Sequence, residues 1–332
     1  MVCKKGFAFD KVLIEGSWVV RNISTALFAD LNYCNSLKDV FALSNKNCHN
    51  IIYIAAGDYE VRALRKSDAC IRLNDDSEII FDGHVILQPN DFICYSIVRI
   101  EGSNIILKGN GFIEGDKTTH IGTEGEWGMG VAIYNGRNIK IENLFICNCW
   151  GDCIYIAEKS QKITIRGCRL SDSRRQGISV ISASDVKIDK CVIKDIKGTE
   201  PQFGIDIEPN KGDTVRRVKI SKTIIDNCKG GIMTFGRALE SIVEDVILTK
   251  CIITNVLTNP VHLNKSEKVT VKNCEIYCSK KYNTIDCFEI KNVLLKNNKL
   301  KVPDSPRDRT SKLVTIRESQ EVQNSRNQII YY

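Results

Sequence analysis

The stretch that decides the fold is "ITIRGCRL" at residues 163–170, because it recurs along the chain with small variations. Apolar residues stand at its first, third and eighth positions, and a small or polar residue stands at the sixth. Later copies read "VKIDKCVI" at 186–193 and "VTVKNCEI" at 269–276. Short β-branched segments with alternating apolar positions are typical of β-strands, so the repeat predicts strands with little helix.

Nine copies of this pattern are separated by 26, 34, 24, 23, 32, 28, 23 and 24 residues, and they start at Ile79, Ile105, Ile139, Ile163, Val186, Val218, Val246, Val269 and Val293. A unit of this length with two or three short strands fits one coil of a right-handed parallel β-helix. The leucine and asparagine frame of a leucine-rich repeat is missing. We therefore predict an all-β solenoid whose coils stack at about 4.8 Å per rung.

The sixth position of the repeat predicts a ladder of small side chains at an internal bend, made of Asn110, Cys168, Cys191, Thr223, Cys251, Cys274 and Asn298. Leu144 interrupts the series, and His84 falls at the same position and is interpreted as structural. An odd total of 15 cysteines in a long chain favours reduced core thiols over disulfides. "CNCWGDC" (147–153) resembles part of a zinc site, but the only other close pair, Cys274 and Cys278, has no histidine beside it. The chain has only 4 histidines, so we do not predict zinc.

The two ends differ from the repeats, and we predict three segments: a cap at 1–50, coils at 51–300 and a C-terminal cap or tail at 301–332. The cap contains a predicted amphipathic helix with Ser24 as N-cap and apolar residues at helical spacing, namely Phe28, Leu31, Leu37, Val40 and Phe41. The tail, "KVPDSPRDRTSKLVTIRES" (301–319), loses the period.

Composition limits the partners and the location. No apolar run approaches the roughly 20 residues that span a bilayer, and "MVCKKGFAFD" (1–10) has no hydrophobic signal region. We expect a cytoplasmic or virion-associated protein, secreted only if a leader has been removed. The net charge is +7, and its dispersed lysines and arginines indicate a solvated face that also suits an acidic polymer. No aromatic-basic signature appears, so nucleic acid is the weaker option.

A second strand of each coil can be aligned, with Ile133, Ile154, Ile178, Ile205, Ile232 and Val261 facing inward. The following residues then face outward as one column: Tyr134, Tyr155, Ser179, Asp206, Met233 and His262. Two residues later the outward positions are Ala157, Ile181, Glu208 and Phe235. We predict an exposed strip that carries the acids of "FGIDIEPN" (203–210) among aromatic residues suited to stacking on sugar rings.

The longest steps of the repeat place extra residues in "DKTTHIGTEGEWG" (116–128), "KGTEPQ" (197–202), "EPNKGDTVRR" (208–217) and "TFGRALESIVED" (234–245). Long loops on neighbouring coils tend to wall a groove and to carry function. We therefore predict a groove over the strip. Its predicted substrate-binding residues are Trp127, Tyr155, Tyr134, Arg174, Gln176, His262 and Phe235.

The predicted catalytic residues are Asp206, Glu208, Asp152 and Arg175. Asp206 and Glu208 are two residues apart on one strand, so their Cα atoms lie about 6.5–7 Å apart. Asp152 lies two rungs away, at about 10 Å. Inverting glycosidases separate their carboxyl groups by roughly 6.5–9.5 Å, and retaining ones by about 5–5.5 Å. Either pairing suits inversion better than retention.

A helical segment followed by "IYIAAGDYEV" (52–61) and coils of some 23 residues resembles the pectin-lyase-like superfamily of right-handed parallel β-helices, over nearly the whole chain. "GEWGMG" (125–130), "CWGDCIYI" (149–156) and "RRQGISVI" (174–181) resemble segments of members that act on polysaccharides. Those members include pectate lyases, polygalacturonases, alginate epimerases and phage tailspikes. The Asn-Thr-Asp, Gly-His-Gly and Arg-Ile-Lys segments of polygalacturonases are missing, so the resemblance implies a substrate class, not a mechanism.

Three functions stay open, and hydrolysis of an acidic polysaccharide, without a cofactor, comes first. A lyase or C5-epimerase would neutralise a uronate with Arg175 or a lysine and use His262, Tyr155 or an arginine as base. The acids could then hold Ca²⁺. A non-catalytic carbohydrate-binding or adhesin solenoid would use the same aromatic residues, and a phage tailspike would be a homotrimer.

Overall fold

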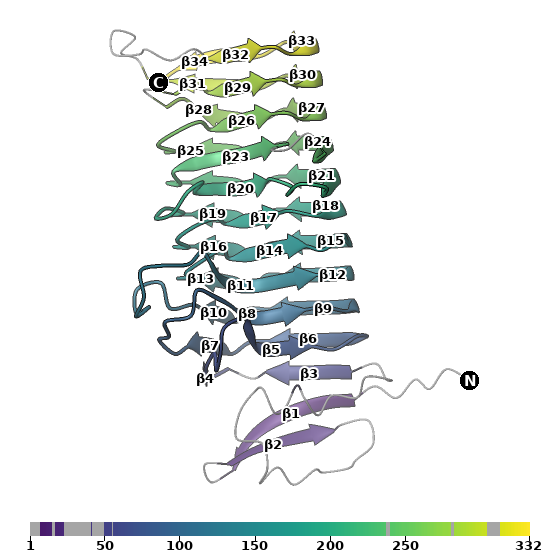
Figure 1. The fold of residues 1–332 in the computed structure, drawn as a ribbon, viewed down its shortest axis with the longest axis vertical. Coiled ribbons are helices and arrows are strands. Elements are labelled where there is room, and N and C mark those ends of the chain that lie inside the picture. The colour runs from purple at the N-terminus through teal and green to yellow at the C-terminus, as the bar shows by residue number, and fades with distance from the viewer. Residues whose placement is uncertain are drawn as a thin grey trace, which may run out of the picture.

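The computed structural model describes residues 7–14, 17–22, 41, 50–54, 56–236, 240–279, 282–303 and 313–332. In these residues the chain winds into a tall stack of coils, which Figure 1 shows from the side, with the long axis vertical. Within the same ranges, no helix combines the length and apolar character needed to cross a membrane.

Each full coil contributes one strand to each of three sheets. The first strand of a coil belongs to a 10-stranded sheet formed by β5 (Asp68–Leu73), β8 (Cys94–Ile100), β11 (Trp127–Tyr134), β14 (Ile154–Ala157), β17 (Ile178–Val180), β20 (Phe203–Ile207), β23 (Gly230–Phe235), β26 (Val261–Asn264), β29 (Ile285–Phe288) and β32 (Val314–Arg317).

The second strand belongs to a 13-stranded sheet formed by β2 (Ser17–Asn22), β1 (Phe7–Ile14), β3 (Asn50–Ile54), β6 (Ser77–Phe81), β9 (Ser103–Gly109), β12 (Arg137–Glu142), β15 (Ser160–Arg166), β18 (Ala183–Asp189), β21 (Thr214–Ser221), β24 (Ile242–Thr249), β27 (Glu267–Lys272), β30 (Lys291–Lys296) and β33 (Gln320–Ser325).

The third strand belongs to an 11-stranded sheet formed by β4 (Asp58–Val61), β7 (His84–Leu87), β10 (Phe112–Glu114), β13 (Phe145–Cys147), β16 (Arg169–Ser171), β19 (Val192–Lys194), β22 (Ile224–Asp226), β25 (Ile252–Thr254), β28 (Glu275–Tyr277), β31 (Lys299–Val302) and β34 (Gln328–Tyr331).

Parallel pairing dominates all three sheets, and the predicted right-handed parallel β-helix is confirmed. The β1–β2 pair is antiparallel and extends the 13-stranded sheet at the N-terminal end of the stack (Figure 1). The predicted N-terminal helix lies outside the described residues except for Phe41. That side chain is buried within the hydrophobic core.

The interior is a set of apolar columns that follow the repeat. The repeat starts from Ile105 onward are register partners from coil to coil, through Ile139, Ile163, Val186, Val218, Val246, Val269 and Val293. These side chains are fully or almost fully buried. Each such residue contributes roughly 1.5–3 kcal/mol of hydrophobic stabilisation, so the repeat itself supplies the core.

The alignment of the first repeat is wrong by two residues. Ile79 pairs with Leu107 instead of Ile105. A period-two pattern matches equally well after a shift of two positions, so the sequence could not fix this register. As a result His84 lies outside the ladder. Asn110 also lies outside it, because Phe112 follows Ile105 by seven positions, whereas its register partner Phe145 follows Ile139 by six. Asn110 is exposed, and His84 sits between Asp58 and Glu114, at 3.2 and 2.9 Å.

The remaining ladder is confirmed at the bend between the 13-stranded and 11-stranded sheets. Its members Cys168, Cys191, Thr223, Cys251, Cys274 and Asn298 are buried, and all four cysteines are free thiols. The Cys168 and Cys191 thiols point to main-chain carbonyl oxygens of the preceding coil, at 3.6 and 3.7 Å. The small side chains therefore satisfy backbone acceptors inside the bend.

The described part of the predicted C-terminal tail continues the solenoid. β32, β33 and β34 add one strand to each sheet. The prediction that the period is lost is therefore wrong for 313–332.

The predicted long loops lie on both edges of the 10-stranded sheet. Residues 115–126 and 195–202 lead into β11 and β20, while 208–213 and the described part of 236–241 lead out of β20 and β23. The outer face of the 10-stranded sheet is therefore flanked by these loops on both edges.

Candidate functional site on the 10-stranded sheet

One outward column runs along the middle of the 10-stranded sheet. The register pairs Tyr155, Ser179, Asp206, Met233, His262 and Asp286 in successive coils. The residues on either side of each member, such as Ile205 and Ile207, are buried, and all but Thr234 belong to the hydrophobic core. Strand alternation therefore turns this column away from the core, as the sequence predicted.

Tyr134 belongs to the neighbouring column. Its register partner is Ala157, because Val131 and not Ile133 pairs with Ile154. The predicted alignment is again wrong by two residues, which keeps the same face of the strand. The rings of Tyr134 and Tyr155 still approach to 5.8 Å between centroids.

Asp152 and Arg175 form a buried ion pair beside the column. Arg175 Nη1 lies 3.3 and 3.1 Å from the two carboxylate oxygens of Asp152, and Ser179 Oγ donates to Oδ2 at 2.7 Å. Burial raises the pKa of Asp152, although Arg175 and Ser179 both act to lower it. Burial also disfavours the charged guanidinium, but Asp152, Asp206 and Glu126 outweigh this effect and raise the pKa of Arg175.

Asp206 is not exposed, contrary to the prediction. It faces away from the core, yet its relative exposure is 0%. Gln176 Nε2 donates to Asp206 Oδ2 at 2.9 Å, and Gln176 Oε1 accepts the Phe203 main-chain N–H at 2.7 Å. Phe203 and Met233 are themselves largely buried on this face. Gln176 therefore positions Asp206 and is not available as a substrate contact in this conformation.

Glu208 differs from Asp206 in access. It follows the end of β20, is half-buried, and its main-chain N–H donates to the Val180 carbonyl at 3.2 Å. Two acids that are alike in sequence thus have different surroundings, and of the two only Glu208 reaches solvent.

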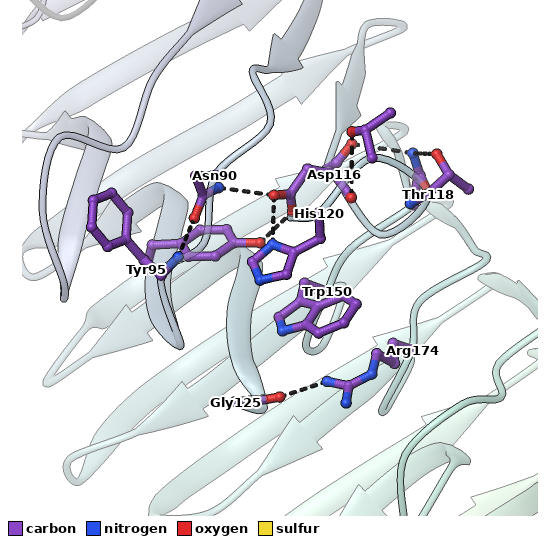
Figure 2. Close-up of polar contacts among 12 residues, drawn as sticks. Asn90, Tyr95, Asp116, Thr118, His120, Gly125, Trp150 and Arg174 are labelled. Atoms are coloured by element: carbon purple, nitrogen blue, oxygen red, sulfur yellow. Dashed lines mark hydrogen bonds and ion pairs between the residues drawn. The ribbon is translucent and has the colours of Figure 1, made fainter. Parts of the chain in front are cut away.

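The 115–126 loop is fixed by a buried polar cluster, shown in Figure 2. Asp116 accepts hydrogen bonds from the Tyr95 hydroxyl and from Asn90 Nδ2, the latter at 2.9 Å. Its carboxylate also lies 2.8 Å from His120 Nδ1. Burial and the Asp116 charge raise the pKa of Tyr95, so this tyrosine stays a neutral donor.

Aromatic stacking continues the cluster toward the strip. The His120 ring lies over Trp150 at 4.0 Å between centroids, and the Arg174 guanidinium lies 3.8 Å from the Trp150 ring (Figure 2). Arg174 Nη1 donates to the Gly125 carbonyl at 2.5 Å. The sequence predicted Arg174 as a substrate contact, whereas in this conformation Arg174 holds the loop. The end of the loop brings Glu126 within 3.5 Å of Arg175.

A cavity of about 360 Å³ opens farther along the same face. It is lined by Glu200, Pro201, Phe203, Lys229, Met233, Thr258, Asn259, His262 and Tyr282. Met233 and His262 follow Asp206 in the same outward column. Lys229 and Tyr282 come from segments that flank the sheet. Aromatic walls with a few charged groups are typical of ligand sites.

A chain of polar contacts lies under one side of the cavity. His262 Nδ1 is 3.2 Å from Asp286 Oδ2, and Arg317 Nη2 is 3.2 Å from the same oxygen. Asn283 Nδ2 donates to Asp286 Oδ1 at 3.2 Å. The interaction with nearby His262 lowers the pKa of Asp286, even though burial opposes it. The Asp286 carboxylate is therefore ionised at neutral pH beside the His262 ring.

The remaining predicted contacts are spread along the sheet. Trp127 is 47% exposed at the start of β11, five residues before Ala132, the register partner of Tyr155. That distance is about 16 Å along a strand, so Trp127 and Tyr155 do not line one compact pocket. Phe235 is half-buried in the column of Tyr134.

Several site residues escaped the sequence analysis, namely Asp286, Arg317, Lys229, Phe203 and Tyr282. Asp286 could have been found, because "TIDCFE" (284–289) repeats the alternation of "PVHLNK" (260–265) one coil later. The others come from strand ends and loops that carry no repeat pattern.

The cysteine trio of 147–153 is part of the structural interior. Cys149 and Cys153 are fully buried, and burial raises the pKa of the Cys147 thiol to about 12. Among the described residues, no three His, Cys, Asp or Glu side chains are grouped so that they could hold a metal ion.

Two proteins of Bacillus subtilis strain 168 are similar to part of the chain. The SPbeta prophage-derived uncharacterized protein YorA is 31% identical over 162 residues, which cover 42% of this chain and 28% of YorA. The uncharacterized protein YclG is 28% identical over 208 residues, or 54% of this chain and 36% of YclG. The chain thus spans about a third of the length of these curated relatives.

Solved structures share the fold at low identity. A mannuronan C-5 epimerase A-module of Azotobacter vinelandii aligns with a TM-score of 0.57 and 14% identity, over 89% of this chain and 93% of that one. The tailspike of Escherichia coli bacteriophage HK620, in complex with a pentasaccharide, aligns at 0.61 and 14%, over 85% and 56%. Pectate lyase Pel9A aligns at 0.58 and 10%, over 87% and 73%.

The model of one protein family, described as the right-handed beta helix region, matches residues 50–245. This match covers more than half of the chain and agrees with the stacked parallel coils. The chain therefore belongs to the right-handed β-helix family.

Proposed function

We propose that the protein acts on an acidic, uronate-containing polysaccharide bound in the cavity beside His262. The observation that carries the proposal is the His262–Asp286 pair at the edge of this cavity, with Lys229 on its lining. Asp286 Oδ2 lies 3.2 Å from Nδ1, and His262 itself lines the cavity. A histidine beside a carboxylate at the edge of a ligand cavity is a suitable general base.

The chemistry that fits these groups is removal of the C5 proton of a uronate. Lys229, now paired with Glu200, would instead bind the substrate carboxylate and make the C5 proton more acidic. His262 would take that proton. In a lyase the electron pair forms the C4–C5 double bond while the C4–O bond breaks and the leaving oxygen gains a proton. In an epimerase a proton returns to C5 from the opposite face.

The lining of the cavity supports a sugar ligand. Phe203 and Tyr282 offer apolar faces, and Asn259 and Thr258 offer polar groups for hydroxyls. The described side chains provide no group of three that could hold Ca²⁺, so no step of the proposal uses it. The names of the epimerase, lyase and tailspike structures agree with this substrate class, although the likeness is one of fold.

Hydrolysis is the second candidate, and the position of Glu208 favours it. Glu208 is half-buried and two residues from Asp206, a Cα separation of about 6.5–7 Å that suits inversion. Asp206 would have to leave its contact with Gln176 before it could meet a substrate. For that reason the His262 chemistry is preferred.

The test is incubation with uronate and neutral polysaccharides while absorbance of unsaturated uronate, new reducing ends and C5 configuration by NMR are followed, with and without EDTA. His262→Gln should lower turnover by about 10² or more, the usual scale for a lost general base. His84→Gln is the matched control, because His84 also lies beside carboxylates, Asp58 and Glu114, but on the 11-stranded sheet. It should keep turnover within twofold.

The outcomes separate the candidates. Unsaturated products support a lyase, and inverted C5 centres without cleavage support an epimerase. Reducing ends without unsaturation, lost in Glu208→Gln and retained in His262→Gln, would replace the proposal with hydrolysis. Binding without any product would indicate a non-catalytic carbohydrate-binding solenoid.

A further inference from the structure

The outer face of the 13-stranded sheet carries a second concave feature. Two hollows of about 620 and 500 Å³ lie over β12 to β27, and they share Thr164, Lys187 and Lys219 on their lining. Shared lining residues make them one groove along the stack. Between β15 and β27 it crosses four rung intervals, or about 19 Å.

The groove is strongly cationic. It is lined by eight basic side chains, Lys162, Arg166, Lys187, Arg217, Lys219, Lys222, Lys250 and Lys272, and by two acidic ones, Asp185 and Asp189. Eight minus two leaves +6, against +7 for the whole chain. The excess charge of the protein is therefore concentrated here, although its lysines are dispersed along the sequence.

The two acids are already engaged. Arg217 contacts both oxygens of Asp185, at 2.7 and 2.9 Å, and Ser221 Oγ donates to Asp189 at 2.8 Å. Arg166 lies 3.9 Å from Asp189. By contrast, none of the six groove lysines forms an ion pair with a residue in the described ranges. Their charges are left for an external partner.

The spacing of the lysines follows the coils. Lys187 and Lys219 are register partners on adjacent strands, so their Cα atoms are about 4.8 Å apart. Lys222 and Lys250 occupy the same bend position in successive coils, linked by the hydrogen bond from Lys222 N to the Thr249 carbonyl. Cations at such a regular spacing suit a linear polymer with a charge on each unit.

The backbone conformation gives an independent reason to assign a binding role to Lys222 and Lys250. Lys222 and Lys250 have positive φ values of 51° and 56°, a region that favours asparagine or glycine. In the other coils that bend position holds Asn143, Gly167, Lys190, Asn273 and Asn297, and Lys190 also has a positive φ, of 55°. Lysine stands in the middle coils at a conformational cost that asparagine would lessen, and these coils are the ones that line the groove.

We propose that this groove binds a strand of acidic polysaccharide, separately from the cavity beside His262. Hydroxyls of Thr164, Ser221 and Thr249 lie between the lysines, a mixture that suits carboxylates and sugar hydroxyls together. None of the described residues that line it is aromatic, so these residues provide no stacking platform of the kind that single-stranded nucleic acids use. The groove would anchor polymer to the side of the solenoid and does not require catalysis.

The test compares two triple variants in the His262→Gln background, so that the polymer is not consumed. Lys187→Gln, Lys219→Gln and Lys250→Gln remove charge from the groove. Lys194→Gln, Lys197→Gln and Lys299→Gln remove the same charge from exposed positions elsewhere. Affinities for polygalacturonate and alginate oligomers, a dextran and a single-stranded oligonucleotide are measured by calorimetry at 50 and 500 mM NaCl.

The groove triple should weaken uronate binding at low salt at least tenfold and flatten its salt dependence, while the control triple should change it less than threefold. Equal losses in both triples would overturn the proposal. Tighter binding of the oligonucleotide would make the groove a nucleic-acid site, and equal dextran binding would show that charge is not recognised. With His262 restored, the groove triple should still convert short oligosaccharides. Failure of the groove proposal can therefore be distinguished from failure of the function proposed for His262.

Discussion

The outer faces of the 10-stranded and 13-stranded sheets come from the same coils, yet one is covered and the other is open. On the first, Asp152, Gln176 and Asp206 are fully buried. On the second, Lys187, Lys219 and Lys250 are exposed. The difference arises at the edges of the sheets. The long loops adjoin the 10-stranded sheet, whereas short bends connect the described strands of the 13-stranded and 11-stranded sheets. The coil repeat specifies the interior, so the loops decide whether an outward side chain becomes buried.

The largest effect expected from this comparison is on the buried ion pair. Arg175→Met should lower the free energy of unfolding by about 3–5 kcal/mol, because it leaves buried carboxylates without their cation. Arg217→Met removes a similar ion pair, with Asp185, from the open face. It should leave the melting temperature almost unchanged, since that pair is solvated. Equal losses, measured by denaturant titration, would show that burial does not distinguish the two faces.

The second expected effect is a pH dependence of that loss. In the wild type, burial already raises the pKa of Asp152, and removing Arg175 should raise it further. A folded pKa above the unfolded value of about 3.9 means that the folded state binds more protons, so stability increases as pH falls. The deficit of Arg175→Met relative to wild type should therefore shrink from pH 7 toward pH 4.5. A constant or growing deficit would contradict an ionised Asp152.

The smallest expected effect compares two serines that each donate to an aspartate. Ser179→Ala removes the 2.7 Å bond to the buried Asp152 and should cost about 1–3 kcal/mol. Ser221→Ala removes the 2.8 Å bond to Asp189 in the open groove and should cost about 0.5 kcal/mol or less, because water replaces it. Thermal unfolding of the two variants provides the measurement, and a reversed order would refute the assignment.

The fold was largely predictable because its information is local and repeated. Alternating Ile and Val positions defined the strands, and small residues such as Cys168 and Cys191 marked the bend. The errors at Ile79 and Ile133 were both shifts of two residues. A shift of two keeps every side chain on its face, so hydrophobic patterning cannot detect it, and only the pairing of neighbouring strands settles the register.

The sequence predicted which side chains of the candidate site point outward, but it did not predict which of them are buried or what they contact. The outward column of Tyr155, Asp206 and His262 followed from alternation alone. The burial of Asp206 did not, since it depends on Gln176, which donates to Asp206 from the preceding coil and is itself held by the Phe203 main-chain N–H. Lys229 and Tyr282 both line the cavity although they are 53 residues apart, and no local pattern links them.

By itself the sequence determined the solenoid, its inward and outward faces, the thiol ladder and the long loops beside one sheet. These follow from a two-residue alternation and a coil-length repeat, which act between near neighbours in the chain or between matching positions of adjacent coils. Only the tertiary structure decided which outward residues are buried, which acid keeps a path to solvent, and where the lysines gather. Those properties depend on side chains that meet across coils and loops, where distance in space is independent of distance along the chain.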